Sequence, residues 1–176
     1  EGIGFVMYYG PFQFTIRLQE AMEQQGVDAV FLTDPTVYDS NYVEQGGSTV
    51  DGTYVYSVIQ RFEDTKIPEM VLYRQWLERV APGSIPNYYG LFAWSASRLF
   101  VQKATELGGD LTRPALVDAL KGVKDWTSNG IHAPMAIGAK TTPGCIKMFR
   151  LDSGSWSQVS PGDFMCGPLV DSGVGG

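Results

Sequence analysis

The stretch that decides the fold runs from residue 5 to residue 32 and reads FVMYYGPFQFTIRLQEAMEQQGVDAVFL. Its first residues, Phe5–Tyr9, are a short apolar run typical of a strand. Its last residues, Val27–Leu32, form a second such run that is interrupted only by Asp28. Because an amphipathic helix fits between them, the stretch predicts a βαβ unit, a parallel sheet and a right-handed crossover. The fold class is therefore α/β, with parallel sheets flanked by helices.

The helix in this unit has a start signal, an apolar face and a stop signal. Pro11 suits the first turn of a helix. Phe14, Leu18 and Met22 recur every four residues, which places them on one face. Gly26 is typical of a helix C-cap.

The residues after the second strand form a polar loop, Thr33–Asp39, at the carboxyl end of that strand. Ligands usually bind at this edge of an open α/β sheet. A short helical segment then runs to about Gln45 and stops at the Gly46-Gly47 pair. The β-branched and aromatic run Thr53–Val58 predicts a further strand.

The middle of the chain changes to a helical pattern, and the end returns to strands. One helix carries Leu72, Trp76 and Val80 on its apolar face. A longer helix spans residues 88–107, and a third follows Thr112, which can cap it. We expect Phe92, Ala96, Leu99 and Phe100 on the inner face of the long helix, and strands at Pro134–Ile137, Ile146–Leu151 and Trp156–Val159, the last two joined by a hairpin turn.

Composition excludes several classes of protein. The chain has 176 residues, a net charge of −6 and a pI of about 4.7, so it lacks the basic surface of a nucleic-acid-binding protein. No apolar run approaches the ~20 residues that cross a bilayer, so we expect no direct membrane insertion by this segment. Its first residues, Glu1 to Gly4, do not resemble a signal peptide, and we expect the signal segment to lie outside this chain.

The two cysteines, Cys145 and Cys166, are either a disulfide or two buried thiols. Both lie in Gly/Pro-rich segments, which favours the disulfide and hence an oxidising compartment. Histidines or further cysteines at zinc spacing are missing, so we expect no metal site. No cofactor motif is present either.

Several short sequence segments along the chain resemble those of one family, the leucine/isoleucine/valine-binding type of type I periplasmic solute-binding protein. Residues 26–30, GVDAV, resemble its helix-to-strand turn, and residues 46–55 resemble the stretch that leads into a hinge strand. Residues 93–96, AWSA, stand where members carry a Tyr-Asp-Ala-like word, residues 115–120 resemble the short helix that follows, and residues 145–159 resemble the terminal hairpin.

The resemblance implies two α/β lobes joined by crossing strands, with a small-molecule ligand in the cleft. Members are roughly twice as long, so this chain would supply the later part of the fold. Residues 1–57 would end lobe 2, residues 58–140 would end lobe 1, and residues 141–176 would return to lobe 2. The protein would work outside the cytoplasm, as a periplasmic protein or surface lipoprotein, and deliver its ligand to the membrane permease of an ABC importer.

The same resemblance points to candidate ligand-binding residues. Amino-acid binders in the family hold the ligand's ammonium with an acidic residue after the second strand; here that position falls on Pro35, beside Asp34. Either Asp34 takes this role or the ligand is not an α-amino acid. Each candidate also has a structural reading: Trp94 as core, Phe12 as a hydrophobic staple, Asp34 and Tyr38 as turn residues. The candidates are Tyr8, Tyr9, Phe12, Asp34, Thr36, Tyr38 and Trp94.

An enzymatic function has little support in the sequence. The chain has no G-x-S-x-G elbow, H-E-x-x-H, P-loop or G-x-G-x-x-G motif. A Ser-His-Asp or Cys-His site would have to be built on His132, the only histidine. Two alternatives remain: a ligand-sensing domain of the same fold in a receptor or regulator, and, less favoured, a doubly wound enzyme.

Overall fold

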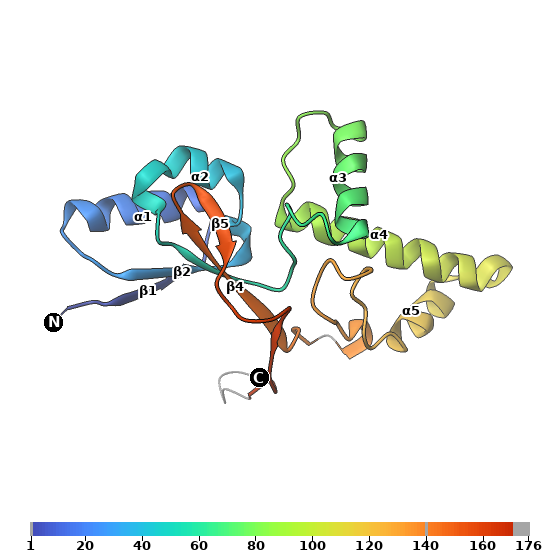
Figure 1. The fold of residues 1–176 in the computed structure, drawn as a ribbon. Coiled ribbons are helices and arrows are strands. Elements are labelled where there is room, and N and C mark those ends of the chain that lie inside the picture. Colours follow the sequence, from blue (N-terminus) through green and yellow to red (C-terminus); the bar gives the residue numbers. More distant parts are fainter. Residues whose placement is uncertain (1, 140, 171–176) are drawn as a thin grey trace.

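The computed structural model describes residues 2–139 and 141–170. These residues form two parts, which lie side by side in Figure 1. The sheet part contains the β-strands with helices α1 and α2, and the helical part contains α3, α4 and α5. The chain passes from the sheet part to the helical part after β3 and returns at β4.

The sheet confirms the predicted α/β class. Its strand order is β1-β2-β3-β4-β5, in which the first three strands are parallel and the last two are added antiparallel. The parallel register pairs Tyr8 with Thr33 and Thr33 with Val55, so the strands end together at one edge. The bounds are β1 Phe5–Tyr8, β2 Val30–Thr33, β3 Tyr54–Ser57, β4 Cys145–Asp152 and β5 Ser155–Gln158.

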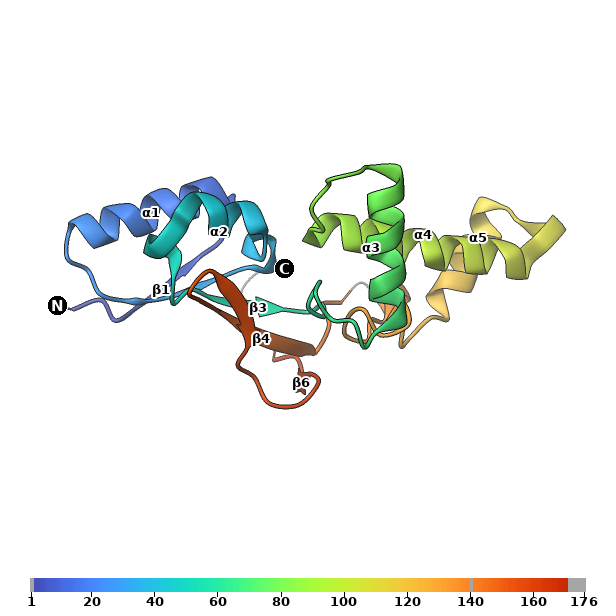
Figure 2. The same ribbon diagram turned by 45° about the horizontal axis from the view of Figure 1, so that its top comes forward.

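Helices α1 (Phe12–Gln24) and α2 (Ser40–Gly46) cover one face of this sheet, as both ribbon views show (Figures 1 and 2). The predicted apolar face of α1 is only partly right: Leu18 and Met22 are half-buried, but Phe14 is 54% exposed, and Thr15, Ile16 and Gln19 are buried. Gln19 can be buried because its amide is bonded on both sides. Its Nε2 donates to Thr53 Oγ1 at 2.7 Å, and its Oε1 accepts from the hydroxyl of Tyr42 at 2.6 Å.

The helical part consists of α3 (Pro68–Val80), α4 (Tyr88–Leu107) and α5 (Arg113–Lys121). In Figure 2, α3 crosses α4 steeply and α5 lies beside α4. The predicted inner face of α4 is only partly right: Leu99 is buried, but Phe100 is 51% exposed. On α3, Trp76 and Val80 are likewise exposed, and the buried face is one residue out of step with the predicted one. Short 3-10 turns lie at Pro35–Val37, Gly47–Val50, Gly108–Asp110 and Ile137–Ala139.

The last third of the chain corrects one predicted strand and confirms two. Residues 134–137 form no strand, although Met135 makes an isolated bridge with Trp126, because the segment turns into the 3-10 helix at Ile137. The hairpin between β4 and β5 is as predicted. Ser153 and Gly154 both have positive φ, as a two-residue turn with the twist of a hairpin requires.

The predicted disulfide is confirmed: Cys145 and Cys166 are bonded. Cys166 belongs to the short strand β6 (Met165–Cys166), which pairs with the start of β4. Beside it, the buried ammonium of Lys147 meets Gln60 Oε1, Gln158 Oε1 and Asp163 Oδ1. These contacts join β4 to the segment that follows β3, so they stabilise the place where the chain passes between the two parts.

No helix among the described residues is long and apolar enough to span a membrane.

Candidate functional site

A cavity of about 700 Å³ lies where the carboxyl ends of β1 and β2 meet the first turn of α4. We call it the cleft cavity. It brings together residues from the sheet part and the helical part. Four of the predicted ligand residues line it: Tyr9, Phe12, Asp34 and Thr36. Its other important lining residues are Gln13, Asp39, Asn87, Tyr88 and Tyr89.

The polar side of the cleft cavity is built by two capped turns. Asp34 caps the 3-10 turn after β2, and its Oδ1 accepts from Thr36 N at 2.9 Å and from Thr36 Oγ1 at 2.5 Å. Asp39 caps α2 in the same manner, with Oδ1 accepting from Asn41 N and Asn41 Nδ2. Both carboxylates are therefore held in place by their own loops, which is the turn-forming reading of Asp34.

The aromatic side of the cleft cavity is built mainly from tyrosines. Tyr9 packs near Tyr56 with ring centroids 6.1 Å apart, and Tyr88 meets Tyr89 edge-on at 5.7 Å. Burial raises the pKa of the Tyr88 hydroxyl, and the nearby Asp34 carboxylate adds to that rise. Burial also raises the pKa of Tyr56, with contributions from Tyr9 and Asp34. The tyrosines and Asp34 thus lie within electrostatic reach of one another.

Three predicted ligand residues lie outside the cleft cavity. Tyr8 folds back over its own chain, so that a side chain at Gly10 would meet its ring and hydroxyl. Tyr38 is buried in the core, where its ring stacks on Phe62 at 4.9 Å. Trp94 lies two turns along α4, and its Nε1 donates to Glu69 Oε1 at 2.8 Å. Their ligand roles stay predictions.

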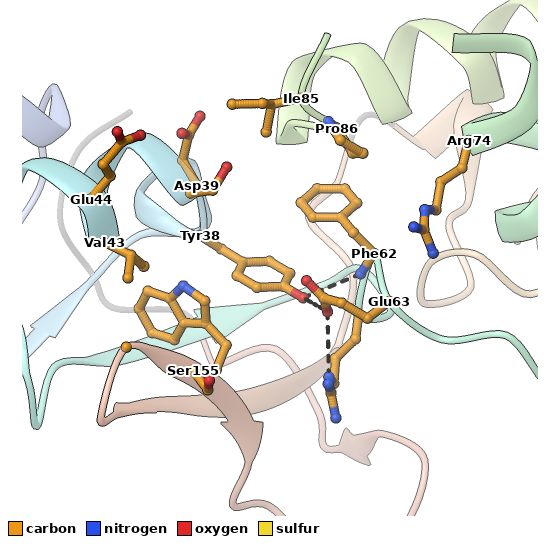
Figure 3. A pocket seen from close by; sticks show the side chains of 14 residues that line it. Tyr38, Asp39, Val43, Glu44, Phe62, Glu63, Arg74, Ile85, Pro86 and Ser155 are labelled. Atoms are coloured by element: carbon orange, nitrogen blue, oxygen red, sulfur yellow. Dashed lines mark hydrogen bonds and ion pairs between the residues drawn. The ribbon is translucent and has the colours of Figure 1, made fainter. Parts of the chain in front are cut away.

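Tyr38 instead forms one wall of a second cavity of about 540 Å³, which opens beside the crossing from β3 to α3 (Figure 3). Its hydroxyl donates to Glu63 Oε2 at 2.5 Å and accepts from Phe62 N at 3.2 Å. Arg61 lies 3.6 Å from the same carboxylate. Figure 3 shows Arg74, Ile85 and Pro86 across this cavity from Val43 and Glu44. The Tyr38 hydroxyl therefore joins the loop after β2 to the segment that follows β3.

His132 is buried in the helical part with both ring nitrogens bonded. Its Nδ1 lies 2.8 Å from Ala133 O and must donate there, since a carbonyl oxygen can only accept. Its Nε2 then accepts from Ser95 Oγ at 2.8 Å, and Ser95 Oγ accepts from Trp126 Nε1 at 2.8 Å. Burial lowers the pKa of His132, so the ring is neutral. This is a core histidine, away from both cavities.

Among residues 2–139 and 141–170, no group of three or more His, Cys, Asp or Glu side chains is placed to hold a metal ion.

Comparison with known proteins identifies the family. Residues 1–155 match the family described as periplasmic binding protein, which is most of the chain. The chain belongs to the periplasmic binding protein family. No curated protein matches the chain.

Solved structures show the same fold at low sequence identity. The chain is similar to a fatty acid ABC transporter substrate-binding protein from Thermomonospora curvata, with a TM-score of 0.77 and 13% identity over 93% of this chain and 43% of that one. It is also similar to a branched chain amino acid ABC transporter protein from Thermus thermophilus with bound valine, with a TM-score of 0.73 and 12% identity over 94% and 47% of the two chains.

A third similar structure is a possible leucine/isoleucine/valine-binding protein from Rhodopirellula baltica. Its TM-score is 0.72, with 14% identity over 88% of this chain and 42% of that one. The chain therefore spans less than half the length of these periplasmic binding proteins. The type I fold expected from the resemblance is confirmed for this part.

Five residues that line the cleft cavity of this family member were not among the predicted ligand residues: Gln13, Asp39, Asn87, Tyr88 and Tyr89. For Asn87 the sequence did hold a signal, because Asn is a preferred N-cap residue. Asn87 caps α4 by accepting from Gly90 N at 2.9 Å. Tyr56 on β3 does not line the cavity, but its ring packs near that of Tyr9, which does.

Proposed function

We propose that this chain is the later part of an extracytoplasmic solute-binding protein that captures a small molecule for an ABC importer. The observation that carries this proposal is the cleft cavity. It lies at the carboxyl edge of a parallel sheet, it is shared by the sheet part and the helical part, and four independently predicted ligand residues line it. Clefts of this kind are the usual ligand sites of open α/β folds.

The mechanism that fits this arrangement is hinge closure. Residues 1–57 and 141–176 would move as one lobe and residues 58–140 as part of the other. A ligand that touches Tyr9 and Asp34 on one side and Tyr88 and Tyr89 on the other contacts both lobes at once. It therefore favours the closed state by the contacts that exist only in that state. The hydrogen bonds of Lys147 and Tyr38 hold the segment that crosses between the lobes. They would therefore allow the lobes to rotate relative to each other without coming apart.

The ligand would be an amino acid, an amide, or an aromatic or apolar acid, and the partner would be the membrane permease. Tyrosine and phenylalanine rings offer apolar surface together with hydroxyl groups, which suits a ligand with an apolar body and a polar end. The described lining of the cleft cavity contains no histidine or cysteine, and the hydroxyl of Thr36 is bonded to Asp34 within the capped turn after β2. This supports a binding protein and not an enzyme.

A second candidate is a ligand-sensing domain of the same fold. It is supported by the similarity to a structure named an extracellular ligand-binding receptor, from Rhodopseudomonas palustris HaA2, at 13% identity and a TM-score of 0.70. The sensor would use the same cleft cavity but pass the closure to a fused signalling domain.

Ligand binding to the purified full-length protein tests the proposal. Native mass spectrometry would detect a co-purified small molecule, and a thermal-shift screen of amino acids, amides and acids would rank ligands. Small-angle scattering should then show a smaller radius of gyration with ligand than without it. Absence of any ligand from all classes, in a protein that is folded by circular dichroism, would refute a binding function.

A further inference from the structure

The charge of the cleft cavity narrows the ligand further, an inference that rests on the proposed function. Among the described residues that line the cavity, Asp34 and Asp39 are the only charged ones, and neither lysine, arginine nor histidine is present. An acidic ligand seated here would meet these two carboxylates and no side-chain counter-charge from the described residues. A cation would be attracted by both carboxylates.

The carboxylates in this cavity have only part of their hydrogen-bonding capacity left for a primary ammonium, which needs several hydrogen bonds. Oδ1 of Asp34 already accepts two hydrogen bonds from Thr36, and Oδ1 of Asp39 accepts two from Asn41. Their negative charge still acts on the cavity, but half of their hydrogen-bonding oxygens are used by the loops. A cation that needs charge more than hydrogen bonds fits this wall better.

Aromatic faces supply what such a cation needs. Tyr9 and Phe12 come from the sheet part, and Tyr88 and Tyr89 come from the start of α4, so rings line the cavity from both sides. Tyr9 is 56% exposed and Tyr89 is 71% exposed, which leaves much of their surface open to a ligand. Rings of this kind attract alkylated ammonium groups by cation–π interaction, and the attraction grows when the site closes and water leaves.

We propose that the ligand carries an alkylated ammonium group, of the trimethylammonium class, which is held between the tyrosine rings beside Asp34. An N-methylated amino acid or an amino alcohol of this type would satisfy the field and the rings together. The proposal favours ligands with an ammonium group and disfavours free apolar acids.

Four small probes of related shape separate the contributions of charge and methylation. Choline carries the trimethylammonium group, ethanolamine carries a primary ammonium, 3,3-dimethylbutan-1-ol is the neutral carbon analogue of choline, and 3,3-dimethylbutanoate is an anion of similar shape. Isothermal titration calorimetry on the full-length protein should show choline binding at least about tenfold more tightly than each of the other three. Equal or tighter binding of ethanolamine, the alcohol or the anion would overturn the inference.

Two pairs of variants locate the effect in the cleft cavity. Asp34→Asn should weaken choline binding about tenfold, while the matched control Asp28→Asn, an exposed carboxylate in the turn before β2, should leave it unchanged. Tyr89→Phe keeps the ring and should keep binding within about twofold, whereas Tyr89→Leu should lose about tenfold. Unchanged affinity in both Asp34→Asn and Tyr89→Leu would overturn the inference.

Failure of this inference differs from failure of the proposed function. If a broad screen finds an acid or a simple amino acid whose affinity falls in Tyr89→Leu, the protein binds its ligand in the cleft cavity but the cation assignment is wrong. If no small molecule binds at all, the solute-binding proposal itself is refuted.

Discussion

The first turn and the middle of helix α4 are one element with two different roles. At the first turn, Tyr89 is exposed and Tyr88 lines the cleft cavity. Two turns further on, Ser95 is buried and bonded to His132, and Trp94 is bonded to Glu69. In the middle of the helix, polar groups are paired with one another, and at its start aromatic surface faces a cavity.

This difference between the two regions of α4 shows how a ligand-binding surface can be distinguished from a core surface. Buried polar groups in a core are paired, because an unpaired one costs free energy. A ligand wall instead shows large side chains with free surface at the edge of an element. Figure 1 shows the start of α4 turned toward the sheet part, while its middle packs within the helical part.

The largest effect should come from breaking the paired middle of α4 at Glu69. This carboxylate is 5% exposed and accepts from Trp94, Arg98 and Asn129. Glu69→Ala leaves those donors without their acceptor and opens a small void, so the free energy of unfolding should fall by about 3–5 kcal/mol. Urea unfolding followed by circular dichroism measures the change.

The matched control for Glu69 is Glu20→Ala, an exposed glutamate on α1. It should change the free energy of unfolding by about 0.5 kcal/mol at most. Similar losses in the two variants would mean that the Glu69 cluster is no more important to stability than surface charge.

The contrast also explains how far the sequence could be read. The βαβ unit and the hairpin were predictable because strand runs, helix stops and turns are local signals. The apolar face of α1 was predictable only in part, because Gln19 is buried by bonds to Tyr42 and Thr53, which are distant in the sequence. Three-dimensional pairing decided which side of the helix faces inward.

The candidate site, like the fold, could be predicted only in part from the sequence. Tyr9, Phe12, Asp34 and Thr36 follow strand ends, and strand ends of a parallel sheet meet at one edge. Trp94 was chosen from a local word in the long helix, and such a word does not fix which turn of the helix reaches the cleft. The pairing of Trp94 with Glu69, 25 positions earlier, has no local signature.

The paired middle of α4 should also make the free energy of unfolding depend on pH, through His132. His132 is buried and neutral, and its pKa lies below the ordinary value of 6.5. The unfolded chain therefore takes up a proton at a higher pH than the folded protein does. The free energy of unfolding should fall as the pH is lowered through about 6.5, by up to about 1.4 kcal/mol per pH unit, and level off below the folded pKa.

Urea unfolding between pH 7.5 and 5.5 measures this slope. In His132→Gln the slope should be much smaller, because the variant lacks the imidazole that binds a proton more readily in the unfolded chain. An unchanged slope in the variant would assign the pH dependence to another group.

The third prediction separates packing from ligand contact at Trp94. Trp94→Phe keeps an aromatic ring against Tyr73 and removes the N–H that bonds to Glu69. The free energy of unfolding should fall by about 1 kcal/mol. We expect ligand affinity in the full-length protein to stay within about twofold, because Trp94 does not line the cleft cavity. A tenfold loss of affinity would restore the ligand role that the resemblance gave it.

The smallest effect on stability should come from the exposed first turn. Tyr89 is 71% exposed and contacts Tyr88 edge-on, so Tyr89→Ala removes a large ring that supports little of the core. The free energy of unfolding should change by no more than about 0.5 kcal/mol, as for other surface substitutions. A loss above about 2 kcal/mol would show that the ring is packed in the folded protein, and the difference between the two regions of α4 would disappear.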